Sequence, residues 1–285
     1  MGESGIGRAM VRPILVCLLA VGCTSSGVPA NGNRGYVTAT NTHVVQSGAS
    51  VDDASADAAF PGRSTAPACA SSVRVGHCVF SSGCPNVVAP GVQSDTAGVI
   101  SIDGALVPIV LRPDSSPTPY LFDRPGTQGW SGGETLAFAA SGGSIPAFSG
   151  GIRAPAVPIV RAPTLDDNPP QSGLPTHTLT VDRSRDLAIA WDSPFATTLR
   201  FGLSSSATQT MSPSASMSCD FDATTKQGTV PASLLAMMPD GQGTVAVGAF
   251  NSSDVAVGDW TISLTAQTGA TAPDGSAFGV PVLFR

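Results

Sequence analysis

The stretch GVISIDGALVPIVL, residues 98–111, decides the fold class of this chain. Two apolar runs flank Asp103 and Gly104, a pair that favours the two-residue type I′ turn of a β-hairpin. Pro108 lacks an amide N–H, so its strand should lie at a sheet edge or contain a bulge. We therefore predict a hairpin here, and the surrounding sequence repeats this pattern of short strands between turns.

The flanking sequence predicts a first β-sandwich domain over residues 36–163. Runs rich in β-branched, aromatic and small apolar residues predict further strands over 36–40, near 58–60, over 134–140 and over 157–160. The rest of 46–68 is polar and small, and we expect it to be a loop. No helical apolar period is sustained over a useful length, so this domain should be all-β.

A polar, proline-rich stretch, residues 164–176, predicts a linker to a second domain over 177–285. Short strands are expected there at 177–181, 187–191, 198–203, 216–221, 244–250, 260–264 and 278–284. Regular short strands between turn residues indicate a two-sheet sandwich of immunoglobulin size. One short helix is predicted over 231–238, with proline in its first turn. The predicted fold class is therefore all-β, with two tandem β-sandwich domains.

The N-terminus has the features of an export signal. Arg8 and Arg12 precede an apolar run over 13–21, which is shorter than the roughly 20 residues that cross a bilayer. Ala20 to Cys23 resembles the bacterial lipobox. The resemblance implies that residues 1–22 are a lipoprotein signal peptide, that Cys23 carries the lipid, and that 23–35 form a flexible tether. The alternative is an ordinary cleaved signal followed by an incidental cysteine.

Four cysteines remain beyond the signal and the lipidation site, and export predicts disulfides among them. Residues 69–84 are symmetric about Gly76-His77, which suits a type II′ hairpin turn with Val75 opposite Cys78 and Val73 opposite Phe80. This hairpin sets Cys69 opposite Cys84, and we predict that they form a disulfide.

Other cysteine pairings stay open. Cys69 with Cys78, or Cys78 with Cys84, would also close a small loop. With Cys69 bonded to Cys84, Cys78 and Cys219 are either buried thiols or a bond between the two domains. No CxxC pair occurs, so we expect no zinc site.

The last third of the chain resembles the Ig-like (fibronectin-type) β-sandwich modules of bacterial cell-surface lipoproteins. The shared features are an early tryptophan strand, a Cys-Asp-Phe strand, a short helix and a Gly-Asp-Trp strand, at 186–191, 219–221, 230–235 and 258–262. The resemblance implies a fold and a location, but it implies no activity and no catalytic residues.

One stretch matches a hydrolase motif. Gly129 to Gly133 satisfies G-x-S-x-G around Ser131, and with His77 and Asp103 it follows the order His, Asp, Ser of chymotrypsin-like proteases. His77 and Asp103 both fall on predicted turns, however, and a strand rather than a helix follows Ser131. A secreted serine hydrolase is therefore the alternative, and we expect no catalytic residues.

Two further features suggest binding. Tyr120, Phe122 and Trp130 lie in a loop rich in proline and glycine and are candidates for stacking on sugar rings, as in a carbohydrate-binding module. The carboxylate pairs at 52–53 and 166–167 lack the spacing of a calcium loop, so we expect no metal.

The charge balance excludes one class of partner. With 20 acidic and 14 basic residues, the net charge of −6 argues against nucleic acid as a partner. We expect a non-catalytic binding or structural protein of the cell envelope without a cofactor, held at the outer membrane by the lipid on Cys23. Its partner would be a protein or a polysaccharide.

Overall fold

The computed structural model describes residues 32–46, 49–62, 69, 71–83, 95–113, 120–167, 177–205, 215–273 and 278–285. The predicted signal peptide, Cys23 and most of the predicted tether lie outside the described residues. The end of that tether is instead strand, because β1 begins at Asn33. Within the described ranges, no helix has both the length and the apolar character needed to cross a bilayer.

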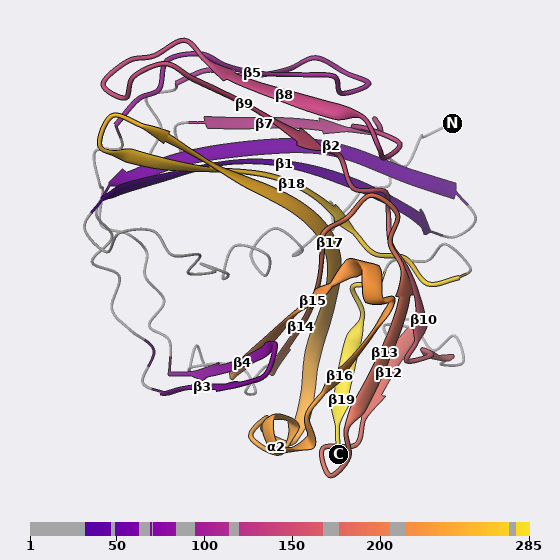
Figure 1. The fold of residues 1–285 in the computed structure, drawn as a ribbon. Helices are drawn as coiled ribbons and strands as arrows, with labels where there is room; N and C mark the ends of the chain where they lie inside the picture. The colour runs from indigo at the N-terminus through magenta and orange to yellow at the C-terminus, as the bar shows by residue number, and fades with distance from the viewer. Residues whose placement is uncertain are drawn as a thin grey trace, which may run out of the picture.

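A single large sheet organises the molecule (Figure 1). In the described part of the chain it contains twelve strands, β1 (Asn33–Gln46), β2 (Ala49–Gly62), β3 (Ser71–Val75), β4 (Cys78–Ser82), β7 (Tyr120–Pro125), β11 (Asp166–Asp167), β12 (His177–Val181), β14 (Thr198–Ser205), β15 (Ser216–Asp222), β17 (Gly241–Val257), β18 (Trp260–Gly269) and β19 (Pro281–Phe284). The all-β prediction is confirmed.

Two smaller sheets pack on the large one and create two sandwiches. The upper sandwich pairs β18, β1, β2 and β7 with a sheet of β6 (Ile109–Leu111), β5 (Ile100–Asp103), β8 (Thr135–Ala140) and β9 (Phe148–Arg153). The lower sandwich covers the rest of the large sheet with β10 (Ile159–Ala162), β13 (Leu187–Asp192) and β16 (Gln227–Val230). Strand β17 runs through both (Figure 1).

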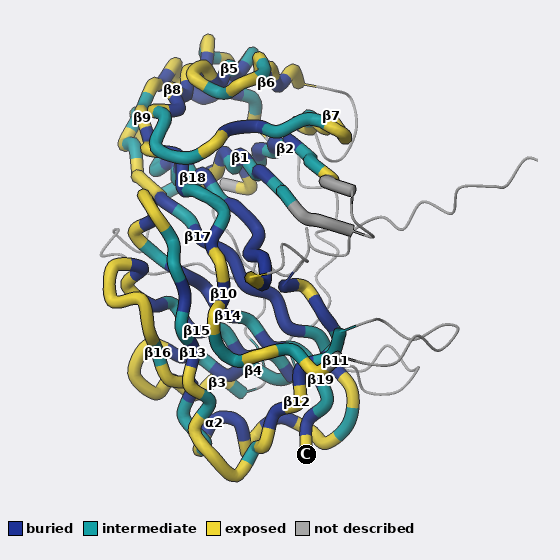
Figure 2. Tube along the Cα trace, turned by 90° about the vertical axis from the view of Figure 1, so that its right-hand side faces the viewer, coloured by how far each residue is buried: buried dark blue, intermediate teal, exposed yellow. Residues whose placement is uncertain are grey.

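The alternation of side chains explains which face of each strand is buried. In β1, Val37 and Ala39 are fully buried, whereas Thr38 and Thr40 point to the other side. The neighbouring strand β18 alternates in the same way, with Ile262 buried. Most buried apolar residues form one core in each sandwich, and Ala196, Ala223 and Ala249 form a small third cluster (Figure 2).

The predicted boundary at residues 164–176 does not separate the two cores. Strand β1 pairs in parallel with β18, so that Val37 lies opposite Leu264, and both residues belong to the upper core. Phe80 of β4 belongs to the lower core. A local strand pattern shows which residues are buried but not which strands pair. The two-domain boundary was inferred from such local patterns alone, so it did not allow for pairing between distant strands.

The predicted loop and linker also contain strand. Residues 49–62 form β2, in which Ala54, Ala56 and Ala58 face the upper core between polar residues. Their small size hid the strand pattern. Within the predicted linker, Asp166 and Asp167 form β11 and pair with the start of β12.

The predicted helix is present but short. Helix α2 (Ala232–Leu235) follows Pro231, and the 3-10 turn η1 (Ala223–Thr225) precedes β16. Leu234, Leu235 and Met238 enter the lower core. The helix therefore closes one end of the lower sandwich (Figure 1).

The hairpin over residues 98–111 is confirmed, but its predicted two-residue turn is wrong. Ile102 lies opposite Ile109, so residues 103–108 form the connection. Pro108 has no N–H to donate to a neighbouring strand. Within the connection, the amide of Leu106 donates to the carbonyl of Gly129 at 2.7 Å. The connection is thus tied to a neighbouring loop.

The β3–β4 hairpin has the predicted register. The disulfide that the structure describes on this hairpin joins it to β15. Val75 lies opposite Cys78, Val73 opposite Phe80, and the positive φ of the turn falls on Gly76. Cys78 bonds to Cys219, its register partner on β15.

The Cys78–Cys219 bond excludes a bond from Cys78 to either Cys69 or Cys84. It is the bond that was considered above as a link between the two predicted domains. Cys69 is itself disulfide-bonded. Cys84, its predicted partner, lies outside the described residues.

Candidate functional site

The G-x-S-x-G stretch forms a capped turn. The amides of Ser131 and Gly132 donate to the two carboxylate oxygens of Glu134 at 2.9 and 2.7 Å. Partial burial raises the pKa of Glu134, but these hydrogen bonds outweigh it and hold the pKa below its usual value. The motif is explained by the geometry of this turn.

The three candidate catalytic residues do not form a triad. His77 lies on the β3–β4 hairpin of the lower sandwich, where its ring centroid is 6.2 Å from that of Phe221. Asp103 ends β5 in the upper sandwich, and Ser131 lies in the turn before β8. No hydrogen bond in the described structure joins any two of them.

The predicted sugar-stacking residues belong to the upper core. Trp130 is 0% exposed and its indole Nε1–H donates to the carbonyl of Pro155 at 2.9 Å. Tyr120 is also buried, and Phe122 packs against the same core. The buried rings of Trp130 and Tyr120 therefore present no surface to a sugar, and Phe122 is partly buried.

The paired carboxylates are engaged elsewhere. Asp52 contacts Nδ1 of His43 at 2.5 Å, and Asp166 accepts a hydrogen bond from the hydroxyl of Thr180 at 2.7 Å. Across the residues that the structure describes, no three His, Cys, Asp or Glu side chains gather closely enough to hold a metal ion.

A polar surface covers the side of the large sheet that faces away from both cores. The sheet bends between the two sandwiches, and this surface lies on the inside of the bend (Figure 1). We call its part over β18, β1, β2 and β7 the concave face, and define it by Tyr36, Thr38, Thr40, Thr42, Asp53, Ser55, Asp57, Leu121, Asp123, Thr265 and Gln267.

The strand register places these side chains in rows. Thr265, Thr38, Asp57 and Leu121 are successive partners across four strands. In the next row the side-chain amide of Gln267 donates to the Thr40 hydroxyl at 2.9 Å. Directly opposed side chains in a sheet lie about 5 Å apart, so each row offers hydrogen-bonding groups at regular spacing.

Two carboxyl groups on the concave face have raised pKa values. Burial raises the pKa of Asp57 to about 6. Burial also raises the pKa of Asp53, and the nearby charge of Asp123 and a hydrogen bond with it raise the pKa further. A hydrogen bond between two carboxyl groups requires a proton on one of them.

One acceptor on this face has no partner. The Oδ1 atom of Asp53 is buried and makes no hydrogen bond within the described structure. A buried acceptor without a partner costs free energy.

Two apolar side chains rise from the same face. Tyr36 is 41% exposed and Leu121 is 66% exposed; Leu121 lies opposite Asp57, and Tyr36 is two residues from Thr38, the other register partner of Asp57. An exposed aromatic ring beside hydrogen-bonding groups is typical of surfaces that hold polar ligands with apolar ring faces.

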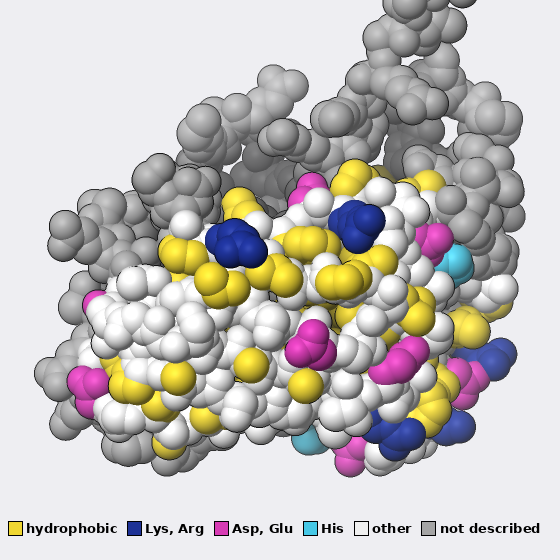
Figure 3. Space-filling view, turned by 90° about the horizontal axis from the view of Figure 1, so that it is seen from above, with side chains coloured by type: hydrophobic (Ala, Val, Ile, Leu, Met, Phe, Trp, Pro, Cys, Tyr) yellow, Lys and Arg dark blue, Asp and Glu magenta, His cyan; other side chains and the backbone are white. Residues whose placement is uncertain are grey.

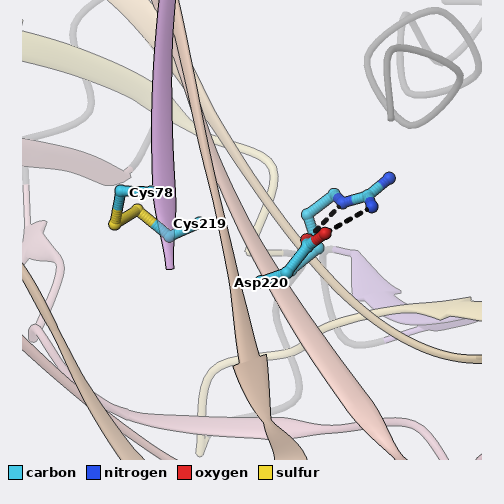
Figure 4. Close-up of a disulfide and its surroundings, with 4 residues drawn as sticks. Cys78, Cys219 and Asp220 are labelled. Carbon is cyan, nitrogen blue, oxygen red and sulfur yellow. Dashed lines mark hydrogen bonds and ion pairs between the residues drawn. A yellow bond between two sulfur atoms is a disulfide. The ribbon is translucent and has the colours of Figure 1, made fainter. Parts of the chain in front are cut away.

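A largely buried ion pair lies on the same side of the large sheet in the lower sandwich. Arg200 of β14 donates to both carboxylate oxygens of Asp220 on β15, at 2.6 and 2.8 Å. Because alternate residues face opposite sides of a strand, the neighbouring Cys219 points to the core and bonds Cys78 there (Figure 4). The disulfide thus lies on the core side of β15, opposite this ion pair.

The sequence contained a signal for the concave face. Thr38 and Thr40 alternate with Val37 and Ala39 in β1, as Ser55 and Asp57 do with Ala54, Ala56 and Ala58 in β2. Alternation of this kind indicates one buried and one polar face.

Comparison with known proteins gives no match. No known protein family matches the chain, and no curated protein or solved structure matches it.

Proposed function

We propose that this protein is a non-catalytic binding module of the bacterial cell envelope, anchored through lipid on Cys23, and that the concave face binds a neutral glycan. The observation that carries the proposal is the placement of Tyr36 beside regular rows of hydroxyl, amide and carboxyl groups on one sheet face. The resemblance to Ig-like surface lipoproteins supports the location.

The chemistry of the face fits a glycan better than other polymers. Sugar hydroxyls donate to carboxylates, and Asp53, Asp57 and Asp123 place carboxyl groups on this face. The apolar face of a sugar ring can pack on Tyr36. The carboxylates of Asp53, Asp57 and Asp123 repel anionic polymers, so the ligand should carry no negative charge.

Isothermal titration with cellohexaose, xylohexaose and chitohexaose tests this function. We expect at least one hexasaccharide to bind, and Tyr36→Ala to weaken its Kd by about tenfold, the scale of one lost ring contact. Leu106→Ala is the matched control, because Leu106 is 57% exposed but lies outside the concave face.

A Kd is interpreted only for folded variants, so the far-UV circular dichroism spectrum of each variant is first compared with that of the wild type. A Kd for Tyr36→Ala equal to that of the wild type would contradict the site. The absence of binding to all three hexasaccharides would contradict the function.

The location is tested separately. We expect mass spectrometry of the mature protein to find acylated Cys23 at the N-terminus, and globomycin to block its processing. An unmodified thiol on Cys23 would contradict the anchor and leave the glycan site to be judged by titration.

A further inference from the structure

The turn at Pro194 and Phe195 has an unusual backbone. Phe195 has φ +64, a left-handed value at which glycine is the usual residue after proline in a turn. For a bulky side chain this conformation costs free energy. Phe195 is also 45% exposed, so burial of its ring does not explain why phenylalanine stands where glycine fits.

The ring of Phe195 supports an arginine. The guanidinium carbon of Arg153 lies 4.2 Å from the ring centroid. Arg153 ends β9, its side chain is exposed, and within the described residues no carboxylate pairs with it. Stacking fixes the plane of a guanidinium and leaves its N–H groups free to bind an oxyanion in that plane.

A buried asparagine fixes the backbone of both residues. Asn251 is 5% exposed, and its amide nitrogen donates to the carbonyls of Arg153 and Phe195 at 2.6 and 2.7 Å. Its Oδ1 accepts from the amide of Thr197 at 2.6 Å. On the other side, a Cβ at Gly133 would lie 3.1 Å from the Phe195 ring. The pair is therefore positioned before any ligand arrives.

The surroundings favour a singly charged group on a flat ligand. Thr135, Ala137 and Gly151, on the outer side of β8 and β9, are exposed and small, and this face carries few charged side chains (Figure 3). The Glu134 carboxylate lies next along the chain to Thr135, the register partner of Arg153. Its charge disfavours a dianionic phosphate more than a carboxylate.

We propose that Arg153, stacked on Phe195, binds the carboxylate of a uronic acid in an acidic polysaccharide. The guanidinium donates two parallel N–H bonds to the carboxylate, and the flat surface of β8 and β9 holds the neighbouring sugar ring. This site lies on the outer side of the small upper sheet, on the far side of the upper core from the concave face, and does not depend on the glycan site there.

Titration of the full-length protein with hexagalacturonate tests the site. We expect Arg153→Gln to weaken the Kd by at least tenfold and to reduce its dependence on salt. Arg153→Lys keeps the charge but loses the planar fork, and we expect most of the loss to remain. Arg112→Gln is the control, because Arg112 is an exposed arginine just after β6 at the opposite edge of the same sheet.

Phe195→Gly separates binding from stability. Glycine relieves the left-handed backbone, so we expect a Tm equal to or above that of the wild type together with a Kd at least tenfold weaker. A Tm several degrees lower would show that the ring serves stability and would overturn the proposal. So would a wild type that does not bind hexagalacturonate, or an Arg153→Gln variant with unchanged Kd. Binding of the neutral hexasaccharide that the concave face accepts should be insensitive to Arg153→Gln, so the two sites are tested separately.

Discussion

The two sandwiches share one sheet but are held together differently. In the upper sandwich, fully buried Asn41 donates to the carbonyl of Trp130 at 3.0 Å and accepts from the amide of Gly129 at 2.8 Å. The lower sandwich also has a buried tryptophan, Trp191, whose indole Nε1–H donates to the carbonyl of Ala223 at 3.0 Å, and in addition a disulfide links Cys78 of β4 to Cys219 of β15. The described residues of both sandwiches thus contain a buried, hydrogen-bonded tryptophan, and the Cys78–Cys219 disulfide adds a covalent link in the lower one.

The difference shows how one sheet can support two cores. Strand β17 crosses from one sandwich to the other, and Asn251 within it bonds to both β9 and the turn before β14. The Trp130 hydrogen bonds of the upper sandwich and the disulfide of the lower one can each be removed by substitutions that leave the other intact. Such substitutions test the contribution of each sandwich separately.

The largest effect is expected at Trp130. Trp130→Ala leaves a cavity in the upper core and removes the hydrogen bond to Pro155, so we expect the free energy of unfolding to fall by about 4 kcal/mol. Trp130→Phe removes the hydrogen bond but keeps most of the ring, and we expect a loss of about 1–2 kcal/mol. Urea titration measures both. Equal losses for the two variants would contradict the role of the ring as the centre of the upper core.

The disulfide comes next. Cys78→Ala with Cys219→Ala opens a loop with a sequence separation of 141 residues, and we expect a loss of about 3 kcal/mol, since engineered tests usually give less than the chain-entropy value. Urea unfolding followed by circular dichroism measures it, and hexasaccharide binding to the concave face should persist. A stability within about 0.5 kcal/mol of the wild type would contradict the assignment of this bond to the lower sandwich.

The smallest effect is expected at Asp57 and depends on pH. Burial raises its folded pKa to about 6, so its ionisation in the folded state costs free energy. The wild type should lose this contribution as pH rises from about 4 through 6. Asp57→Asn cannot ionise, so it should be about 1–2 kcal/mol more stable than the wild type near pH 8 and nearly equal to it at pH 4.

The exposed Asp103 is the control for that pH series. Asp103→Asn should change stability little and by the same amount at both pH values. If Asp57→Asn gains as much at pH 4 as at pH 8, its effect does not come from ionisation.

Local patterns in the sequence predicted strands better than they predicted partners. The β3–β4 hairpin followed from its symmetry about Gly76, because a hairpin register is set within a few residues. The parallel pairing of β1 with β18 joins distant segments, and no local signal indicates it. The same limit applied to Cys78, whose partner follows from the pairing of β4 with β15.

The candidate sites were missed for a related reason. Aromatic residues near prolines and glycines suggested surface stacking, but hydrogen bonds from Trp130 and Tyr120 hold these loops against the core. Phe195 gave no signal, because its left-handed φ and its contact with Arg153 depend on how β9 and the turn before β14 meet.

The shared sheet is the central claim, and one measurement tests it most directly. Thr38 and Thr265 are register partners on β1 and β18. Thr38→Cys with Thr265→Cys should form a disulfide on mild oxidation, detected as a linked peptide by mass spectrometry, whereas Thr38→Cys with Thr261→Cys should not. Equal yields for the two pairs, or no link between residues 38 and 265, would contradict the pairing of the two ends of the chain.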